Sequence, residues 1–228
     1  MSNKQYTTAE PQLRNAIATF VNIFLPRKGY LVTPVLIAIN FLVFAIAWSC
    51  GYDVMKLGPE EMDQLGKHIH SVVQQGEWWW IVAYLFLNGG YIYIIVTTTI
   101  LFIQGYLFEK YVGTLTFLGI YLAAGIVGNI EAVLFSNISP LFHTGPFGGI
   151  LGVFGFVTFL MLTQQIKVSA IHGGLIFFVS VLLSGYLKGL DENSVGPMII
   201  SLAFGMGFGY IQYVKLKRKK QLSHFSEI

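Results

Sequence analysis

The sequence has little charge and almost no cysteine. Asp, Glu, Lys and Arg make up 11% of its 228 residues, whereas 54% are hydrophobic and the mean hydropathy is +0.64. Because soluble domains carry about 25% charged residues, this composition excludes an ordinary soluble protein and indicates a chain that crosses a membrane several times. The single cysteine, Cys50, excludes an internal disulfide and a thiolate metal cluster.

The basic residues do not gather in one soluble patch. The formal net charge is +3, and Lys and Arg stand between long apolar runs. Nucleic-acid binding requires basic residues on one soluble face, so we expect no nucleic-acid partner. Membrane lipids are the partners that this composition predicts, and we expect no cofactor.

Six apolar runs are long enough to cross a hydrocarbon core of about 30 Å. They predict an all-α membrane protein with spans at about residues 31–50, 91–108, 112–132, 147–163, 168–187 and 195–216. Residues 1–30 contain a shorter apolar stretch, which predicts an interfacial helix before the first span. Residues 217–228 then form a basic tail after the six-span domain of residues 31–216.

The distribution of basic residues predicts the orientation of the chain. Six spans place both termini on one side, and positive residues favour the cytoplasmic side. If the termini are cytoplasmic, only Lys56, Lys67 and Lys188 of the 14 basic residues lie outside. We therefore predict cytoplasmic termini. The compact size suggests, by analogy, a multi-pass protein of the bacterial inner membrane.

Residues 143–155 are rich in glycine and begin the fourth predicted span. Closely spaced glycines allow two membrane helices to approach each other. The sixth predicted span carries two more glycines, which also permit a close helix approach. The glycines expected in such packing are Gly145, Gly148, Gly149, Gly152, Gly205 and Gly209.

Two further motifs lie upstream. Residues 78–80 are three consecutive tryptophans, which are typical of the boundary between membrane and water. They are followed by Phe-Leu-Asn-Gly-Gly at residues 86–90, and the second span ends at Glu109.

In order, span number and loop length, these motifs resemble the rhomboid family of intramembrane serine proteases, over residues 31–220. The resemblance implies the rhomboid fold, in which the fourth and sixth spans pack closely against each other through their glycines. Where the family has Gly-x-Ser-Gly, this chain has Gly145-Pro146-Phe147-Gly148, so Phe147 stands at the position of the nucleophilic serine. Met198 stands at the position of the histidine base in the last span. A phenyl ring cannot attack a carbonyl, and a thioether cannot accept the proton.

The positions that correspond to the family's oxyanion side also differ. Asn88 replaces the outer histidine, while Tyr93 and Thr97 replace the histidine and asparagine of a His-x-x-x-Asn motif. Trp80 replaces an arginine of the loop. The resemblance therefore implies a pseudoprotease that binds transmembrane segments of client proteins without cutting them. We also expect Phe147 and Met198 to touch and to fill the space of the lost site.

Two alternatives remain open from the sequence. The chain would be an active serine endopeptidase if another nucleophile had replaced the serine, and His143 and Thr144 are the residues to test for this. Otherwise it would be a structural or lipid-organising protein. His68 and His70 lie two residues apart, but no further ligand accompanies them, so we expect no metal site. His172 and His224 lie away from the expected site.

Overall fold

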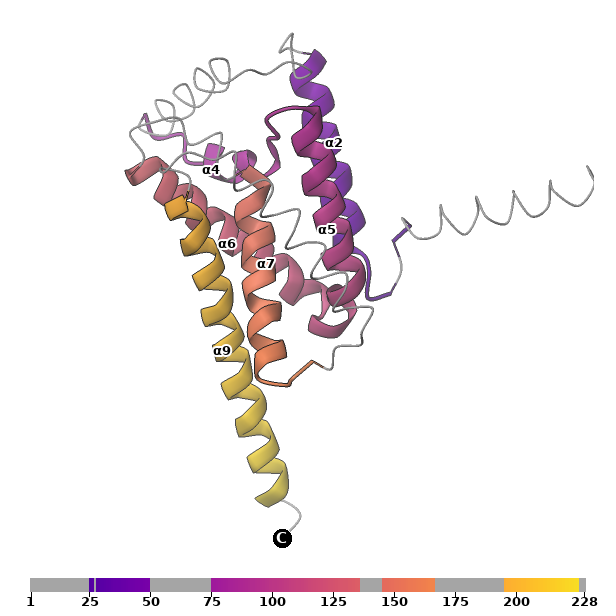
Figure 1. Ribbon diagram of the computed structural model, residues 1–228, viewed down its shortest axis with the longest axis vertical. Coiled ribbons are helices and arrows are strands. Elements are labelled where there is room, and N and C mark those ends of the chain that lie inside the picture. Colours follow the sequence, from indigo (N-terminus) through magenta and orange to yellow (C-terminus); the bar gives the residue numbers. More distant parts are fainter. Residues whose placement is uncertain (1–24, 27, 50–74, 136–144, 167–194, 226–228) are drawn as a thin grey trace, which may run out of the picture.

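The computed structural model describes residues 25–26, 28–49, 75–135, 145–166 and 195–225. Every element within them is a helix (Figure 1). Two short elements begin at the last of the three tryptophans: α4 (Trp80–Ala83) and the 3-10 helix η1 (Tyr84–Phe86). The five long helices are α2 (Val32–Ser49), α5 (Tyr91–Val112), α6 (Thr114–Phe135), α7 (Gly145–Leu162) and α9 (Val195–Phe225).

Five of the six predicted spans are confirmed as helices. The helices α2, α5, α6, α7 and α9 are all long and apolar enough to cross a membrane. The predicted fifth span, residues 168–187, and the predicted interfacial helix before residue 25 lie outside the described residues. Helix α9 runs on to Phe225, beyond the expected end of the span at residue 216. The apolar run ends there, but the basic residues that follow continue the same helix.

Glycine and proline set several helix ends. Gly90 and Gly113 have φ angles of 137° and 88°, which other residues rarely adopt, and they bound α5 on either side. Three helices carry a proline within their first turn, where no intrahelical N–H bond is lost: Pro34 in α2, Pro146 in α7 and Pro197 in α9.

Helix α7 lies at the centre of the bundle. It packs against both α6 and α9, while α2 packs mainly against α5 (Figure 1). Within the described residues, 72% of the α7 span is buried, against 17% of the α2 span. The glycine-rich helix is therefore the core of the fold, and α2 is a peripheral helix with a wide face towards the membrane.

A single carboxylate joins α2 to α5. Glu109, near the end of α5, is fully buried. Its two oxygens accept hydrogen bonds from the backbone N–H groups of Leu31, Val32 and Thr33, at 2.7, 2.9 and 3.0 Å, and from the Thr33 hydroxyl at 2.7 Å. These groups at the start of α2 have no partner inside their own helix, so Glu109 caps α2 from another helix.

Candidate functional site

The glycines of α7 allow α6 to lie against one side of it. A side chain at Gly149 would collide with Tyr121, whose ring and carbonyl oxygen would lie 2.7 and 2.8 Å from its Cβ. A side chain at Gly152 would overlap Ala124. The sequence assigned both glycines to the contact with the last span, whereas the structure places Gly149 against α6 and Gly152 between α6 and α9. The third span therefore shares in packing that the sequence attributed to the sixth.

The other side of α7 meets α9. A side chain at Gly205 would overlap the backbone of Gly152, and one at Gly209 would lie 2.9 Å from the Cβ of Phe159. Helices α7 and α9 are therefore in close contact through these glycines. Gly148 lies where all three helices meet, because a Cβ there would be 3.1 Å from the Cα of Gly125 in α6 and 3.2 Å from the hydroxyl of Ser201 in α9.

Phe147 and Met198 are both buried in this region. Phe147 is 2% exposed and Met198 is 4% exposed, and both belong to one hydrophobic cluster. The start of α7 also approaches the segment that carries Asn88, since a Cβ at Gly145 would lie 2.8 Å from the carbonyl oxygen of Leu87. The structure thus brings the start of α7 close to the segment before α5. Direct contact between Phe147 and Met198 stays a prediction.

The positions on the α5 side form a polar network that points towards α2. The Asn88 side-chain amide donates to the Oδ1 of Asn40 in α2 at 2.9 Å. The Thr97 hydroxyl lies 2.7 Å from the Oδ1 of Asn88 and 2.7 Å from the carbonyl oxygen of Tyr93, and its one proton serves either acceptor. Asn88, Thr97 and Asn40 are buried, whereas Tyr93 is half-buried.

Sequence reasoning missed two polar residues of this region. Asn40 was hidden within an apolar run, and no local signal marked it as the partner of Asn88. Ser201 is fully buried one turn after Met198, and its hydroxyl donates to the carbonyl oxygen of Ala124 at 3.1 Å. Its spacing from Gly205 and Gly209, four residues each time, was a signal that could have identified it as a small packing residue.

The buried serine and threonine hydroxyls that the structure describes in this region are all close to backbone acceptors. The hydroxyls of Ser201, Thr97 and Thr98 all lie within hydrogen-bonding distance of backbone carbonyl oxygens. His68, His70, His143 and His172 lie outside the described residues, and His224 lies in α9 with its side chain undescribed. No group of three metal-ligating side chains occurs in the part of the chain that the structure describes.

Comparison with known proteins identifies the family. The Rhomboid domain family matches residues 75–215, which is more than half of the chain. The protein therefore belongs to the rhomboid family, and the resemblance seen in its sequence is confirmed. With its apolar helices, this makes it a multi-pass integral membrane protein.

Three relatives illustrate the distance within the family. YdcA of Bacillus subtilis (strain 168) is 25% identical over 149 residues, covering 65% of this chain and 72% of YdcA. Rhomboid protease GluP of the same strain is 29% identical over 179 residues, covering 78% of this chain and 31% of GluP. RHOMBOID-like protein 5 of Arabidopsis thaliana is 23% identical over 146 residues, covering 61% of this chain and 47% of that protein. No solved structure gives a significant match.

Proposed function

We propose that this rhomboid-family protein is a pseudoprotease that binds transmembrane segments of client proteins without cleaving them. The observation that carries the proposal is the burial of Phe147, which is 2% exposed at the position of the family's nucleophilic serine. A nucleophile must be reached by both substrate and water. This position instead holds a large apolar side chain inside the hydrophobic core.

The engagement of the neighbouring polar groups supports the same proposal. A protease of this family needs hydrogen-bond donors aimed at the oxyanion of the transition state. The amide of Asn88 donates to Asn40, and the hydroxyl of Thr97 is within reach of Asn88 and of its own helix. These donors hold α2, the segment before α5 and α5 itself together, so they are not free to stabilise an oxyanion.

Binding of client segments rests on the family resemblance and on the apolar outer faces. Ile92 and Ile95, one turn apart on α5, are 58% and 57% exposed. Such a face contacts lipid tails or a further apolar helix in the membrane. The proposal is tested by incubating the purified protein with rhomboid transmembrane substrates and, in parallel, by photo-crosslinking from position 92 or 95 in native membranes. We expect no cleavage above buffer and crosslinks to membrane proteins.

The double variant Phe147→Ser with Met198→His sharpens this test. It restores both reacting groups, but Tyr93 and Thr97 still differ from the family's oxyanion-side residues, and one lost donor costs about 100- to 1,000-fold in rate. We therefore expect weak or no cleavage. Cleavage by the unchanged protein that disappears on changing His143 or Thr144 would instead establish a displaced catalytic centre. Crosslinks to lipid alone would favour a lipid-organising role.

We further propose six spans with both termini in the cytoplasm, in a bacterial inner membrane. Helices α7 and α9 run in the same direction (Figure 1), so the chain leaves α7 at one end of the bundle and enters α9 at the other. This supports the fifth crossing that the sequence predicts. A reporter fused after Ile228 should behave as cytoplasmic and one inserted near Glu61 as external. Both reporters on the same side would overturn this placement.

A further inference from the structure

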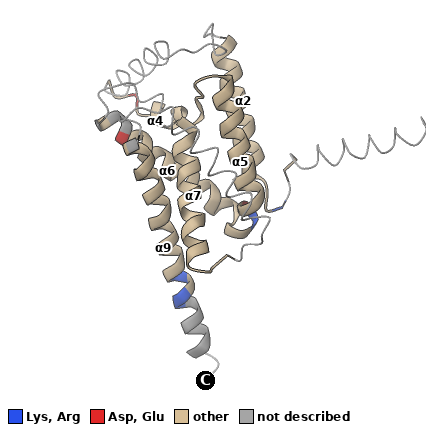
Figure 2. Ribbon diagram, in the orientation of Figure 1, with Lys and Arg blue, Asp and Glu red and all other residues tan. Residues whose placement is uncertain are grey.

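The last helix is longer than the membrane and ends in positive charge. Helix α9 spans 31 residues, or about 46 Å, whereas the hydrocarbon core is about 30 Å thick. It extends past the end of α7 (Figure 1), and the blue residues in its lower part are basic (Figure 2). Lys215, Lys217 and Arg218 are all exposed. Lys219 and Lys220 belong to the same helix, and the helix contains no acidic residue.

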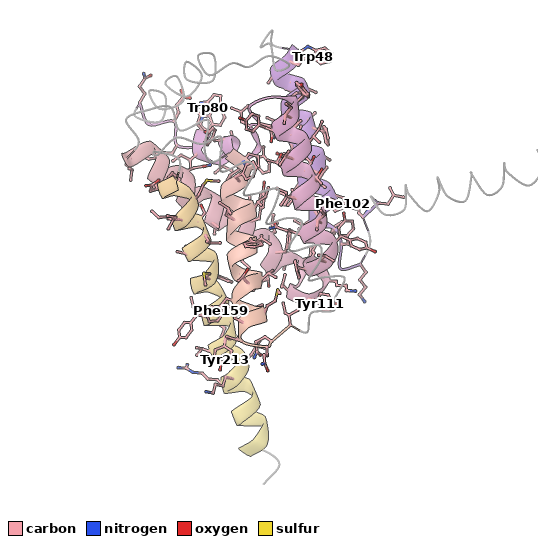
Figure 3. The ribbon with its side chains drawn as sticks, viewed as in Figure 1. Trp48, Trp80, Phe102, Tyr111, Phe159 and Tyr213 are labelled. Carbon is pink, nitrogen blue, oxygen red and sulfur yellow. The ribbon has the colours of Figure 1, made fainter. Side chains whose placement is uncertain are left out.

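Aromatic residues indicate where this helix leaves the hydrocarbon. Tyr210 and Tyr213 pack edge-on against Phe159 of α7, with ring centroids 6.2 and 6.5 Å apart. Figure 3 shows Phe159, Tyr213 and Tyr111 of α5 towards one end of the bundle, with Trp48 and Trp80 towards the other. Tyrosine and tryptophan concentrate at the two membrane surfaces. The position of Tyr213 along α9 therefore indicates the depth of one of these surfaces.

The basic residues follow at the depth of the lipid phosphates. Arg218 is five residues beyond Tyr213, which corresponds to about 7.5 Å along the helix. A headgroup layer is about 5–7 Å thick, because the full bilayer exceeds its core by about 10–15 Å. Lys215, Lys217 and Arg218 therefore lie within or at the edge of this layer.

The charges surround the helix instead of forming one stripe. At about 100° per residue, Lys215, Lys217 and Arg218 stand at about 0°, 200° and 300° around the axis. A protein or nucleic acid would dock on one face and use a one-sided patch. A lipid headgroup layer surrounds the helix on every side, and a ring of positive charge matches it. We propose that this ring, residues 215–220 of α9, binds the phosphate groups of anionic phospholipids.

The test uses the full-length protein in nanodiscs of phosphatidylcholine with a minor fraction of phosphatidylglycerol. The lipids that remain bound after mild detergent extraction are then quantified. The variant replaces residues 215, 217, 218, 219 and 220 by Gln. Each basic residue near the surface contributes about fivefold to anionic lipid binding, so the ratio of bound phosphatidylglycerol to phosphatidylcholine should fall at least about fivefold. In nanodiscs both leaflets carry the anionic lipid, so a signal that acts only during membrane insertion would produce no fall.

A matched variant and a competitor keep the test decisive. Replacing the four lysines of the ring by Arg keeps the charge and should keep the ratio. Millimolar inorganic phosphate should release no more lipid than chloride of equal ionic strength. An equal ratio in the Gln variant, a fall in the Arg variant as large as that in the Gln variant, or specific release by phosphate would overturn the proposal.

Discussion

Two regions of this bundle are held together by different physical means. Around α7 the contacts are mainly apolar and so close that glycine is needed where the backbones meet, as at Gly152 and Gly205. Between α2 and α5, together with the segment just before α5, the buried contacts include polar ones, namely the Glu109 cap and the hydrogen bond between Asn40 and Asn88. The first region depends on shape, and the second depends on satisfying buried polar groups.

Under the proposed function, this difference between the two regions explains how the fold persists without the family's reactive residues. On the α7 and α9 side the replacements, Phe147 and Met198, are apolar and join the hydrophobic cluster. On the α5 side the replacements Asn88 and Thr97 are polar and are hydrogen-bonded to each other. The apolar replacements therefore pack within the apolar region, and the polar replacements are hydrogen-bonded within the polar region. The buried side chains of Asn88 and Thr97 both have hydrogen-bond partners.

The largest effect is expected at the centre of the apolar region. Phe147→Ala should lower the free energy of unfolding by about 3–5 kcal/mol, because it removes a buried ring and leaves a cavity. Denaturation in mixed detergent micelles measures this loss. Phe41→Ala is the matched control, since Phe41 on α2 is 49% exposed and should cost much less. Equal losses would show that position 147 is not specially packed.

The polar region should respond next most strongly, at Glu109. Glu109→Ala leaves three backbone N–H groups and the Thr33 hydroxyl without their acceptor, at a cost of about 3 kcal/mol in unfolding free energy. Glu109→Gln keeps one oxygen acceptor and should lose less. Glu77→Ala removes an exposed carboxylate and should change stability by less than about 0.5 kcal/mol. Similar stability of the Ala and Gln variants of Glu109 would contradict the cap.

A smaller effect separates shape from glycine content in α9. Gly205→Ala pushes a methyl group into the backbone of Gly152 and should cost about 1–3 kcal/mol. Gly207→Ala has nothing within 4 Å of the new methyl and should be neutral or stabilising by up to about 1 kcal/mol, owing to the helix propensity of alanine. The same micelle denaturation applies. If both variants behave alike, close packing of α7 and α9 is refuted.

The smallest expected effect tests whether Asn40 and Asn88 act together. A double-mutant cycle with Asn40→Ala and Asn88→Ala should give a coupling energy of about 1 kcal/mol, since the hydrogen bond that joins them is buried. Strictly additive losses would show that the two amides contribute independently.

Much of the fold could be predicted because membrane helices are recognisable in a sequence as apolar runs long enough to span the hydrocarbon core. Five helices match their predicted spans. The glycine spacing indicated a close helix approach at Gly205, and the family resemblance supplied its partner helix. The α6 side of Gly149 and Gly152 could not be predicted, since a glycine shows that something approaches but not which helix. Asn40 was missed because a single amide in an apolar run forms no repeating pattern that could mark it, and its partner lies 48 residues away.

The capping of α2 by Glu109 also has a consequence for biosynthesis. The carboxylate lies 76 to 78 residues after the groups that it binds. At about 5–20 residues per second, the ribosome needs about 4–16 s to make that stretch. Until then the first turn of α2 has exposed N–H groups, which are costly to bury in lipid and readily hydrated at its surface. The start of the first span is therefore expected to remain near the membrane surface until α5 is complete. A nascent chain stalled on the ribosome before residue 109 should have the start of α2 at that surface.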